Sequence, residues 1–267
     1  MMRFKPTPLN KLHSRCLCVL WLVLLLGLVA CQQNRATWDR IQEAGVLRVG
    51  LDPTFPPFEM ADGVPLQGID VDLAEAIAAD LGLQVEFVYF GYDGLYDALA
   101  TGRVDILISA LVIAIERTRD FAYSEPYFNA GEILIVPTKS DITGMAGLAN
   151  RQLAVELGAQ GHVEATIWQR RLTNLTILPY NTPDEAITAV LTQDADAALV
   201  DMVNGRLFLH ESAATELTYL PDPITVEPYA LVVRRDDERL LDELNNSLDR
   251  LTQTGQLEQI IENWLGP

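Results

Sequence analysis

The fold is decided by residues 70–90, which read DVDLAEAIAADLGLQVEFVYF. From Leu73 to Leu81 an apolar residue recurs every four positions with alanines beside it, which predicts a helix with one apolar face. Gly82 is expected to end this helix, because glycine readily takes the left-handed conformation that follows a last helical turn. Gln84–Phe90 is rich in β-branched and aromatic residues and predicts a strand. A helix followed at once by a strand is typical of an α/β fold.

The alternation of strands and helices continues in both directions. Val46–Leu51 and Val104–Ala110 read as short buried strands, and Asp93–Thr101 reads as a helix that Asp93 caps. This β-α-β-α-β order predicts an open, mostly parallel sheet. A second cycle is expected after Ile133–Pro137, with strands at Gln152–Leu157, Leu175–Tyr180 and Ala195–Val200, an extended segment at Ile224–Val233, and a helix at His162–Arg171.

The clearest helix start along the chain is Thr182-Pro183-Asp184-Glu185. Thr182 can cap the helix, Pro183 suits the first helical position, and Glu185 can reach back to the amide of the cap residue. The last thirty-odd residues predict two more helices, because leucines, isoleucines and Trp264 recur there at helical spacing.

Residues 1–31 have the composition of a secretory signal. They contain four basic residues, all ahead of the apolar core Cys16–Val29, and no acidic residue. The string Leu28-Val29-Ala30-Cys31 resembles the lipobox of bacterial lipoproteins, in which the cysteine is lipidated and becomes the new N-terminus. An uncleaved membrane anchor is the alternative, but the core is shorter than the roughly 20 apolar residues that a span needs. We therefore expect a signal peptide at 1–31, a linker at 32–36, and an extracytoplasmic protein held at the membrane by a lipid on Cys31.

The composition of the remaining chain describes an acidic body without cysteine. Removal of residues 1–31 leaves 236 residues and lowers the net charge from −18 to −22. A surface this acidic repels nucleic acid and anionic lipid, so we exclude both as partners. All three cysteines lie within residues 1–31, which excludes disulfides, thiolate metal sites and cysteine nucleophiles from the folded part of the protein. We expect a monomer with no cofactor and no metal.

A series of short motifs runs from residue 46 to the end of the chain. They read LRVGLDPTFPPFE at 47–59, GIDVDLA at 68–74, YDGL at 92–95, VDILISA at 104–110, ER at 116–117, SEPY at 124–127, QDADAALVD at 193–201 and EPYALVV at 227–233. In this order and spacing the motifs resemble those of family 3 extracellular solute-binding proteins, the amino-acid receptors of ABC importers.

The resemblance implies a type II periplasmic-binding-protein fold, which is α/β with two hinged lobes, each an open mostly parallel sheet flanked by helices. One lobe would comprise residues 37–133 plus 228–267 and the other residues 134–227, with crossings near Ile133–Pro137 and Ile224–Tyr229. An amino acid or a similar small zwitterion would bind in the cleft outside the C-terminal ends of the strands. Closure around it would prepare its delivery to an ABC permease and its ATPase.

The resemblance assigns the two charges of an amino acid to Arg117 and Asp201. The planar guanidinium of Arg117 matches a carboxylate, whereas a lone arginine in a charged stretch is ordinarily solvated. Asp201 ends an apolar strand, where its carboxylate can cap the helix at Met202–His210, bind the ligand's ammonium, or do both. The resemblance also places at the ligand Ser109, Ala110, Val112, Ala159 and Gln160.

Four residues are expected around the ligand's side chain. Phe55 and Tyr92 occupy family positions for aromatic rings, although such rings could instead pack in the core. Asp52 and Glu156 follow strands and should point at the cleft, where a ligand with a neutral side chain would leave their negative charges without a cationic partner. We therefore favour a cationic or polar amino acid, although acids at the position of Asp52 also occur in receptors for neutral amino acids.

Two departures from the family pattern remove hydroxyl groups. The family's SGMTITPER is SALVIAIER at 109–117, so that Val112 replaces a threonine, and its GTTG turn is GAQG at 158–161. The backbone amides of Val112 and Gln160 stay available for a carboxylate. The lost hydroxyls leave open whether the ligand is an ordinary α-amino acid.

Two other functions stay open on the same fold. In a cyclohexadienyl or arogenate dehydratase a general acid acts on a cyclic substrate, and Glu156 or Asp52 could serve if burial raised its pKa. A ligand sensor that feeds a signalling kinase would have the same binding site. His162 and His210 belong to no nucleophile or metal pattern, so we expect a binding protein and not an enzyme.

Overall fold

The computed structural model describes residues 37–61, 65–212 and 214–267. The chain divides into two compact units, the first ending at Ala44 and the second running from Gly45 to Pro267. Among the described residues the first unit holds helix α2 (Thr37–Ala44). The predicted signal peptide, its Cys31 and the predicted linker lie outside the described residues. Within the described ranges, no helix combines the length and the apolar character that a membrane crossing requires.

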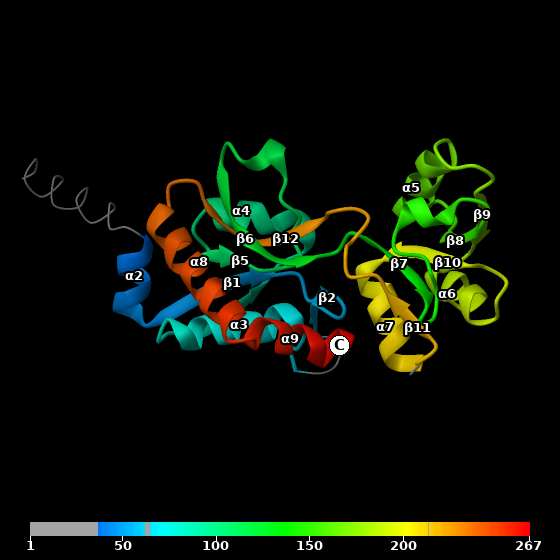
Figure 1. The fold of residues 1–267 in the computed structure, drawn as a ribbon. Coiled ribbons are helices and arrows are strands. Elements are labelled where there is room, and N and C mark those ends of the chain that lie inside the picture. The colour runs from blue at the N-terminus through cyan, green and yellow to red at the C-terminus, as the bar shows by residue number, and fades with distance from the viewer. Residues whose placement is uncertain (1–36, 62–64, 213) are drawn as a thin grey trace, which may run out of the picture. The chain divides into compact units, whose positions relative to one another are not determined.

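The second unit contains two five-stranded sheets (Figure 1). The first sheet is formed by β1 (Val46–Leu51), β4 (Gln84–Tyr89), β5 (Ile106–Leu107), β6 (Phe121–Asn129) and β12 (Pro228–Arg234). Its strand order is β4-β1-β5-β12-β6, in which β1 runs parallel to β4 and β5 and β12 runs antiparallel to β5 and β6. The last strand of the chain therefore lies inside the sheet that the first strand begins.

The second sheet lies between these strands in the sequence. It is formed by β7 (Glu132–Pro137), β8 (Gln152–Glu156), β9 (Thr176–Tyr180), β10 (Ala197–Asp201) and β11 (Leu217–Tyr219). The order is β11-β7-β10-β8-β9, in which β8 is parallel to β9 and β10, whereas β7 is antiparallel to β10 and β11. The inner strands β7 and β10 are buried almost throughout, which explains why both are nearly continuous apolar runs.

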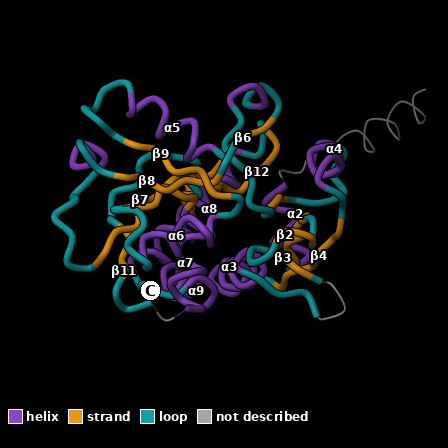
Figure 2. Tube along the Cα trace, turned by 90° about the vertical axis from the view of Figure 1, so that its right-hand side faces the viewer, coloured by secondary structure: helices purple, strands orange, loops and turns teal. Residues whose placement is uncertain are grey.

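Helices cover both faces of the second sheet, as Figure 2 shows. Helices α6 (Pro183–Leu191) and α7 (Met202–Ser212) pack on the face that carries Ile133 and Ile135, and α5 (Gln160–Gln169) packs on the face that carries Leu134 and Val136. Alternate residues of β7 thus serve opposite faces, as strand geometry requires. The helices associated with the first sheet are α3 (Ile69–Asp80), α4 (Leu95–Ala100), α8 (Glu238–Gln253) and α9 (Gln256–Leu265).

Short elements complete the architecture around the ends of the strands. The strands β2 (Thr54–Phe55) and β3 (Glu59–Met60) form a small hairpin after β1. Three single turns of 3₁₀ helix are η1 (Tyr92–Gly94), η2 (Ile115–Arg117) and η3 (Met145–Leu148). The sequence predicted most of the longer helices and strands within a few residues, but it did not predict β6, the longest strand described. It also predicted a strand over Val104–Ala110, of which the structure pairs Ile106–Leu107 as β5.

The helix ends show which local signals were correct. Gly82 has φ +70° directly after α3, as expected. The Thr182 hydroxyl accepts a hydrogen bond from the amide of Glu185, as expected, but the Glu185 carboxylate accepts from the amide of Asn181 and not from that of the cap residue. The prediction that Asp93 caps a helix is wrong, because Asp93 lies inside η1 and α4 begins after Gly94 without a side-chain cap.

The chain passes between the two sheets twice, before β7 and after β11. Ile133–Pro137, expected as a crossing, lies within β7 and pairs with β10 and β11, so this crossing occupies residues 130–131. The two crossings are bonded to each other: the amide of Ile224 donates to the Glu132 carbonyl over 2.7 Å, and the amide of Ala130 donates to the Glu227 carbonyl over 2.9 Å. A side chain at Gly131 would lie 2.0 Å from the Thr225 carbonyl oxygen, so this close approach requires glycine.

Candidate functional site

A pocket of about 340 Å³ lies at the ends of the strands of the first sheet. Six of the predicted ligand residues line it, and they come from the segments that follow β1 and β5 and from η1. The lining residues are Asp52, Thr54, Phe55, Glu59, Tyr92, Ser109, Ala110, Val112 and Tyr229. The structure thus brings together the predicted residues that precede Arg117, and Tyr229 of β12 adds a ring that sequence reasoning missed.

Asp52 is half-buried at the end of β1, and both its carboxylate oxygens accept hydrogen bonds. One oxygen accepts from the Thr54 hydroxyl over 2.8 Å, and the other accepts from the backbone amide of Tyr92 over 2.7 Å. The backbone amide of Asp52 in turn donates to the Ser109 hydroxyl over 3.0 Å. Asp52, and not Asp93, therefore holds the first turn of η1, and it fixes the position of Tyr92 at the pocket.

Two acidic side chains lie buried beneath this pocket. Glu59 accepts a hydrogen bond from the Ser109 hydroxyl over 2.6 Å, and Asp70 accepts from the amide of Ala110 over 2.6 Å and from the Tyr127 hydroxyl over 2.7 Å. Ala110 has φ +45°, a left-handed conformation that its bond to Asp70 helps to hold. The sequence shows these acids but not their burial, which no periodicity or spacing revealed.

Burial decides the protonation of this acidic pair. Burial raises the pKa of Glu59 to about 10, with a further rise from the nearby charge of Asp70. Burial also raises the pKa of Asp70, to about 6, although its hydrogen bonds from Glu59, Tyr127 and Ala110 oppose the rise. At neutral pH Glu59 is therefore an uncharged acid and Asp70 a carboxylate.

The two predicted aromatic residues are exposed at the pocket and not buried in the core. Phe55 is 48% exposed and Tyr92 is 61% exposed. Phe55 stacks on Phe58 with ring centroids 5.8 Å apart, and the buried Phe58 meets Phe128 and Tyr229 edge to face. The aromatic core thus supports Phe55 from behind and leaves its other surface free.

Arg117 lies in η2 with an exposed side chain and does not line the pocket. Its guanidinium carbon is 4.1 Å from the centroid of the Tyr96 ring, a cation–π contact that orients the side chain. Among the described residues, none of the ion pairs found uses Arg117. Its guanidinium therefore keeps its donors available for an external carboxylate, and its ligand role stays a prediction.

The backbone amide of Val112 is not used in the pairing of this segment with β12. Val112 forms an isolated antiparallel bridge with Tyr229. The hydrogen bonds of this bridge run from the amide of Ile113 to the Pro228 carbonyl and from the amide of Ala230 to the Leu111 carbonyl. In an antiparallel pair the residue between such bonds directs its own amide away from the partner strand, so the Val112 amide faces away from β12.

The other four predicted ligand residues belong to the second sheet and do not line the first-sheet pocket. Glu156 ends β8, Ala159 precedes α5, and Gln160 is its first residue. No side chain caps α5; the amide of His162 donates to the Ala159 carbonyl, and the buried Gly161 presents its amide to the Glu132 carboxylate. In this structure these positions form a separate group from Asp52 and its neighbours.

Asp201 ends β10 and caps α7. One carboxylate oxygen accepts from the amide of Asn204 over 2.9 Å, and the other accepts from the Asn204 side-chain amide over 2.8 Å. The capping alternative is therefore confirmed. Each oxygen retains further acceptor capacity, so a bond to an ammonium is compatible with the cap and stays a prediction.

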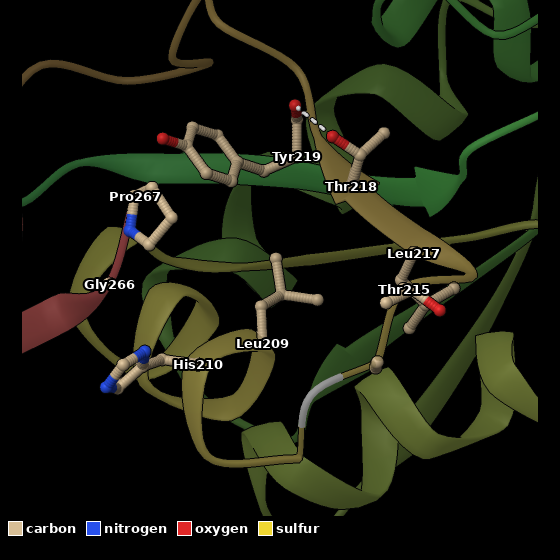
Figure 3. A pocket seen from close by; sticks show the side chains of 9 residues that line it. Leu209, His210, Thr215, Leu217, Thr218, Tyr219, Gly266 and Pro267 are labelled. Carbon is tan, nitrogen blue, oxygen red and sulfur yellow. Dashed lines mark hydrogen bonds between the residues drawn. The ribbon is translucent and has the colours of Figure 1, made fainter.

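A second cavity of about 330 Å³ lies elsewhere, between α7, β11 and the last residues of the chain (Figure 3). Leu209, His210, Tyr219 and Gly266 are among its lining residues, and none of the predicted ligand residues is. Beside it the buried Arg206 of α7 donates a hydrogen bond to the Gly266 carbonyl. Within the described ranges, no cluster of side chains suited to a metal ion occurs.

Comparisons with known proteins agree with this architecture. The arginine-binding extracellular protein ArtP of Bacillus subtilis is 24% identical over 91% of this chain and 97% of its own length. The solved structure of an ancestral cationic amino acid solute-binding protein, AncCDT-1, is 31% identical over 86% of this chain and 99% of its own, with a TM-score of 0.63.

The fold itself matches more closely in a third protein. The L-cystine solute receptor of Neisseria gonorrhoeae, solved in its unliganded open conformation, is 23% identical over 87% of this chain and 98% of its own, with a TM-score of 0.75. Both sheets of the second unit are thus those of a type II periplasmic binding protein. A family model matches residues 47–267, which include both sheets apart from Val46, the first residue of β1. The chain belongs to the bacterial extracellular solute-binding proteins, family 3.

Proposed function

We propose that this protein is the solute-binding component of an ABC importer and that it captures an amino acid between its two sheets. The observation that carries this proposal is the placement of opposite charges on different sheets. The guanidinium of Arg117, which is in no ion pair found among the described residues, lies in the segment between β5 and β6 of the first sheet, and Asp201 ends a strand of the second. A zwitterion carries both complementary charges, so it stabilises an arrangement in which both sheets contact it.

We propose further that the ligand is a basic amino acid. Asp52 supplies negative charge to the first-sheet pocket, whereas Glu59 beneath it is neutral at pH 7. A long cationic side chain could lie against the exposed rings of Phe55 and Tyr92 and end at Asp52. The names of ArtP and AncCDT-1, which refer to arginine and to cationic amino acids, support this ligand class.

Capture without chemical turnover is also part of the proposal. Asp52 accepts two hydrogen bonds within the pocket, an arrangement that suits a charge receptor better than a proton donor. The lipobox-like string ending at Cys31 supports a lipid-anchored, extracytoplasmic monomer that passes its ligand to a permease and its ATPase.

Titration calorimetry with arginine, lysine, histidine, glutamine and leucine tests the proposed function. We expect arginine or lysine to bind more tightly than leucine, because the carboxylates of Asp52 and Glu156 can pair with a cationic side chain. Arg117→Ala should weaken binding at least about 30-fold, since loss of one partner of a buried charge pair costs about 2–5 kcal/mol. Arg119→Ala is the matched control, because this neighbouring arginine is also exposed and none of the predicted ligand contacts uses it.

Three results would contradict these proposals. Tighter binding of leucine than of arginine would overturn the assignment to basic ligands. Equal affinities for Arg117→Ala and Arg119→Ala would remove Arg117 from the site. Binding of none of the amino acids would overturn the proposed function as a whole.

A further inference from the structure

Glu132 is a buried acid that is not among the predicted ligand residues. It is the first residue of β7 and pairs directly with Asp201 across the antiparallel ladder to β10. Residues that face each other in such a ladder project their side chains from the same face of the sheet. Glu132 is 5% exposed, and its Oε2 atom has no hydrogen-bond partner among the described residues.

The surroundings of Glu132 carry negative charge, which favours the binding of a cation. Three acids bring negative charge near Glu132 and raise its pKa: Asp201 on β10, Glu227 on the second crossing and Glu156 at the end of β8. The backbone amide of Gly161 on α5 lowers the pKa of Glu132. None of the ion pairs found among the described residues uses Glu132. A side chain at Gly161 would lie 2.6 Å from Oε2, so glycine at this position allows the start of α5 to approach this oxygen closely.

We propose that Glu132 is a further ligand-binding residue, which shares the ligand's ammonium group with Asp201 and releases a proton when that group binds. The inference rests on the proposed function, because it takes the ligand to be an amino acid whose ammonium reaches Asp201. A buried carboxylate oxygen without a donor is unfavourable, and an ammonium offers three donors that two neighbouring carboxylates can divide. The ligand thus supplies the partner that Oε2 lacks.

The protonation of Glu132 follows from the same geometry. Burial raises the pKa of Glu132 to about 7, with further rises from the charges of Asp201 and Glu227. In the free protein about half of the Glu132 side chains therefore carry a proton at pH 7. A bound ammonium favours the carboxylate, so the O–H bond of Glu132 breaks, its electron pair stays on the oxygen, and the proton passes to the solvent.

The sign of the pH effect follows from this exchange. The pKa of Glu132 is higher in the free protein than in the complex, so binding releases protons and acid opposes binding. Below pH 7 the affinity should fall by up to about tenfold for each pH unit that lies between the two pKa values. Above pH 8 Glu132 is already a carboxylate in the free protein, and its contribution to the pH dependence should vanish.

Titration calorimetry of the full chain with L-arginine between pH 5.5 and 8 tests the inference. Each pH is measured in two buffers with different ionisation enthalpies, because the difference in observed heat gives the number of protons released. The wild-type protein should release about half a proton at pH 7. Glu132→Gln should bind with no comparable release and with a flatter pH profile, whereas Glu216→Gln, an exposed acid near β11, should match the wild type.

The outcomes separate this inference from the proposed function. Wild-type binding of L-arginine without proton release at pH 7 would overturn the inference and leave the proposed function intact. The same holds if Glu132→Gln keeps the wild-type affinity, proton release and pH profile. The wild-type buffer comparison decides the question even if Glu132→Gln fails to fold, which a melting curve without ligand would show. Absence of binding by every amino acid would overturn both proposals.

Discussion

Removal of the Tyr127 hydroxyl should destabilise the protein in a pH-dependent way. Tyr127 donates to Asp70 over 2.7 Å, and both residues are buried. A hydrogen bond to a charged group contributes about 1.5–3 kcal/mol. At 1.36 kcal/mol per pKa unit, loss of this bond should raise the pKa of Asp70 by about one to two pH units. Tyr127→Phe should therefore lower the free energy of unfolding by about 1.5–3 kcal/mol at pH 7.5, where Asp70 is ionised.

The effect should be smaller in acid. The pKa of Asp70 is about 6 in the folded protein, above its ordinary value of 3.8, so the folded state binds a proton more readily than the unfolded state. Stability contributed by this group is therefore present in acid and is lost as the pH rises through 6. At pH 5 Asp70 is mostly protonated, and the lost hydroxyl then removes a neutral hydrogen bond of about 0.5–1.5 kcal/mol.

Urea unfolding followed by tryptophan fluorescence, at pH 5 and at pH 7.5, measures this difference. Tyr89→Phe is the matched control, because the Tyr89 ring is 53% exposed. An equal loss of stability at both pH values would refute the reasoning, since it would show that Asp70 is not the group whose charge the hydroxyl stabilises.

Two further predictions concern the crossings and the N-terminal region. Gly131→Ala should lower the free energy of unfolding by about 3 kcal/mol, because the added carbon would lie 2.0 Å from the Thr225 carbonyl oxygen. Gly91→Ala, where a side chain would meet no atom within 4 Å, should change it little, and equal urea midpoints for the two variants would contradict this account. Cys31→Ala should release the protein from membranes or leave an unprocessed precursor, and wild-type behaviour in fractionation and gel migration would contradict lipidation.

Local patterns in the sequence were sufficient to predict much of the fold. The apolar spacing from Leu73 to Leu81 predicted α3, and the Thr182-Pro183 start predicted α6, because both signals act within one or two turns. The same reasoning failed at Asp93, because the first turn of η1 is held by Asp52, forty residues earlier in the chain. A local pattern carries no information about such a distant acceptor.

The candidate site was predictable in its residue types but not in its charges. The resemblance placed eleven residues around one ligand, and six of them line one pocket of the first sheet, whereas Arg117 and the four residues of the second sheet do not line it. It did not indicate that Glu59 lies buried and neutral, or that Glu132 lies buried opposite Asp201. Protonation depends on burial and on charges from distant segments, and a sequence displays neither.

The position of β12 has a consequence for the order in which the protein is assembled. All of the second sheet is encoded between β6 and β12, so it can complete its pairing while residues 228–267 are still being synthesised. The first sheet cannot, because β12 is the strand that joins β5 to β6. Tyr229 of β12 also lines the first-sheet pocket. A chain interrupted before residue 228 would therefore carry Asp201 on a finished sheet but lack a finished pocket, because the last strand made is the one that completes it.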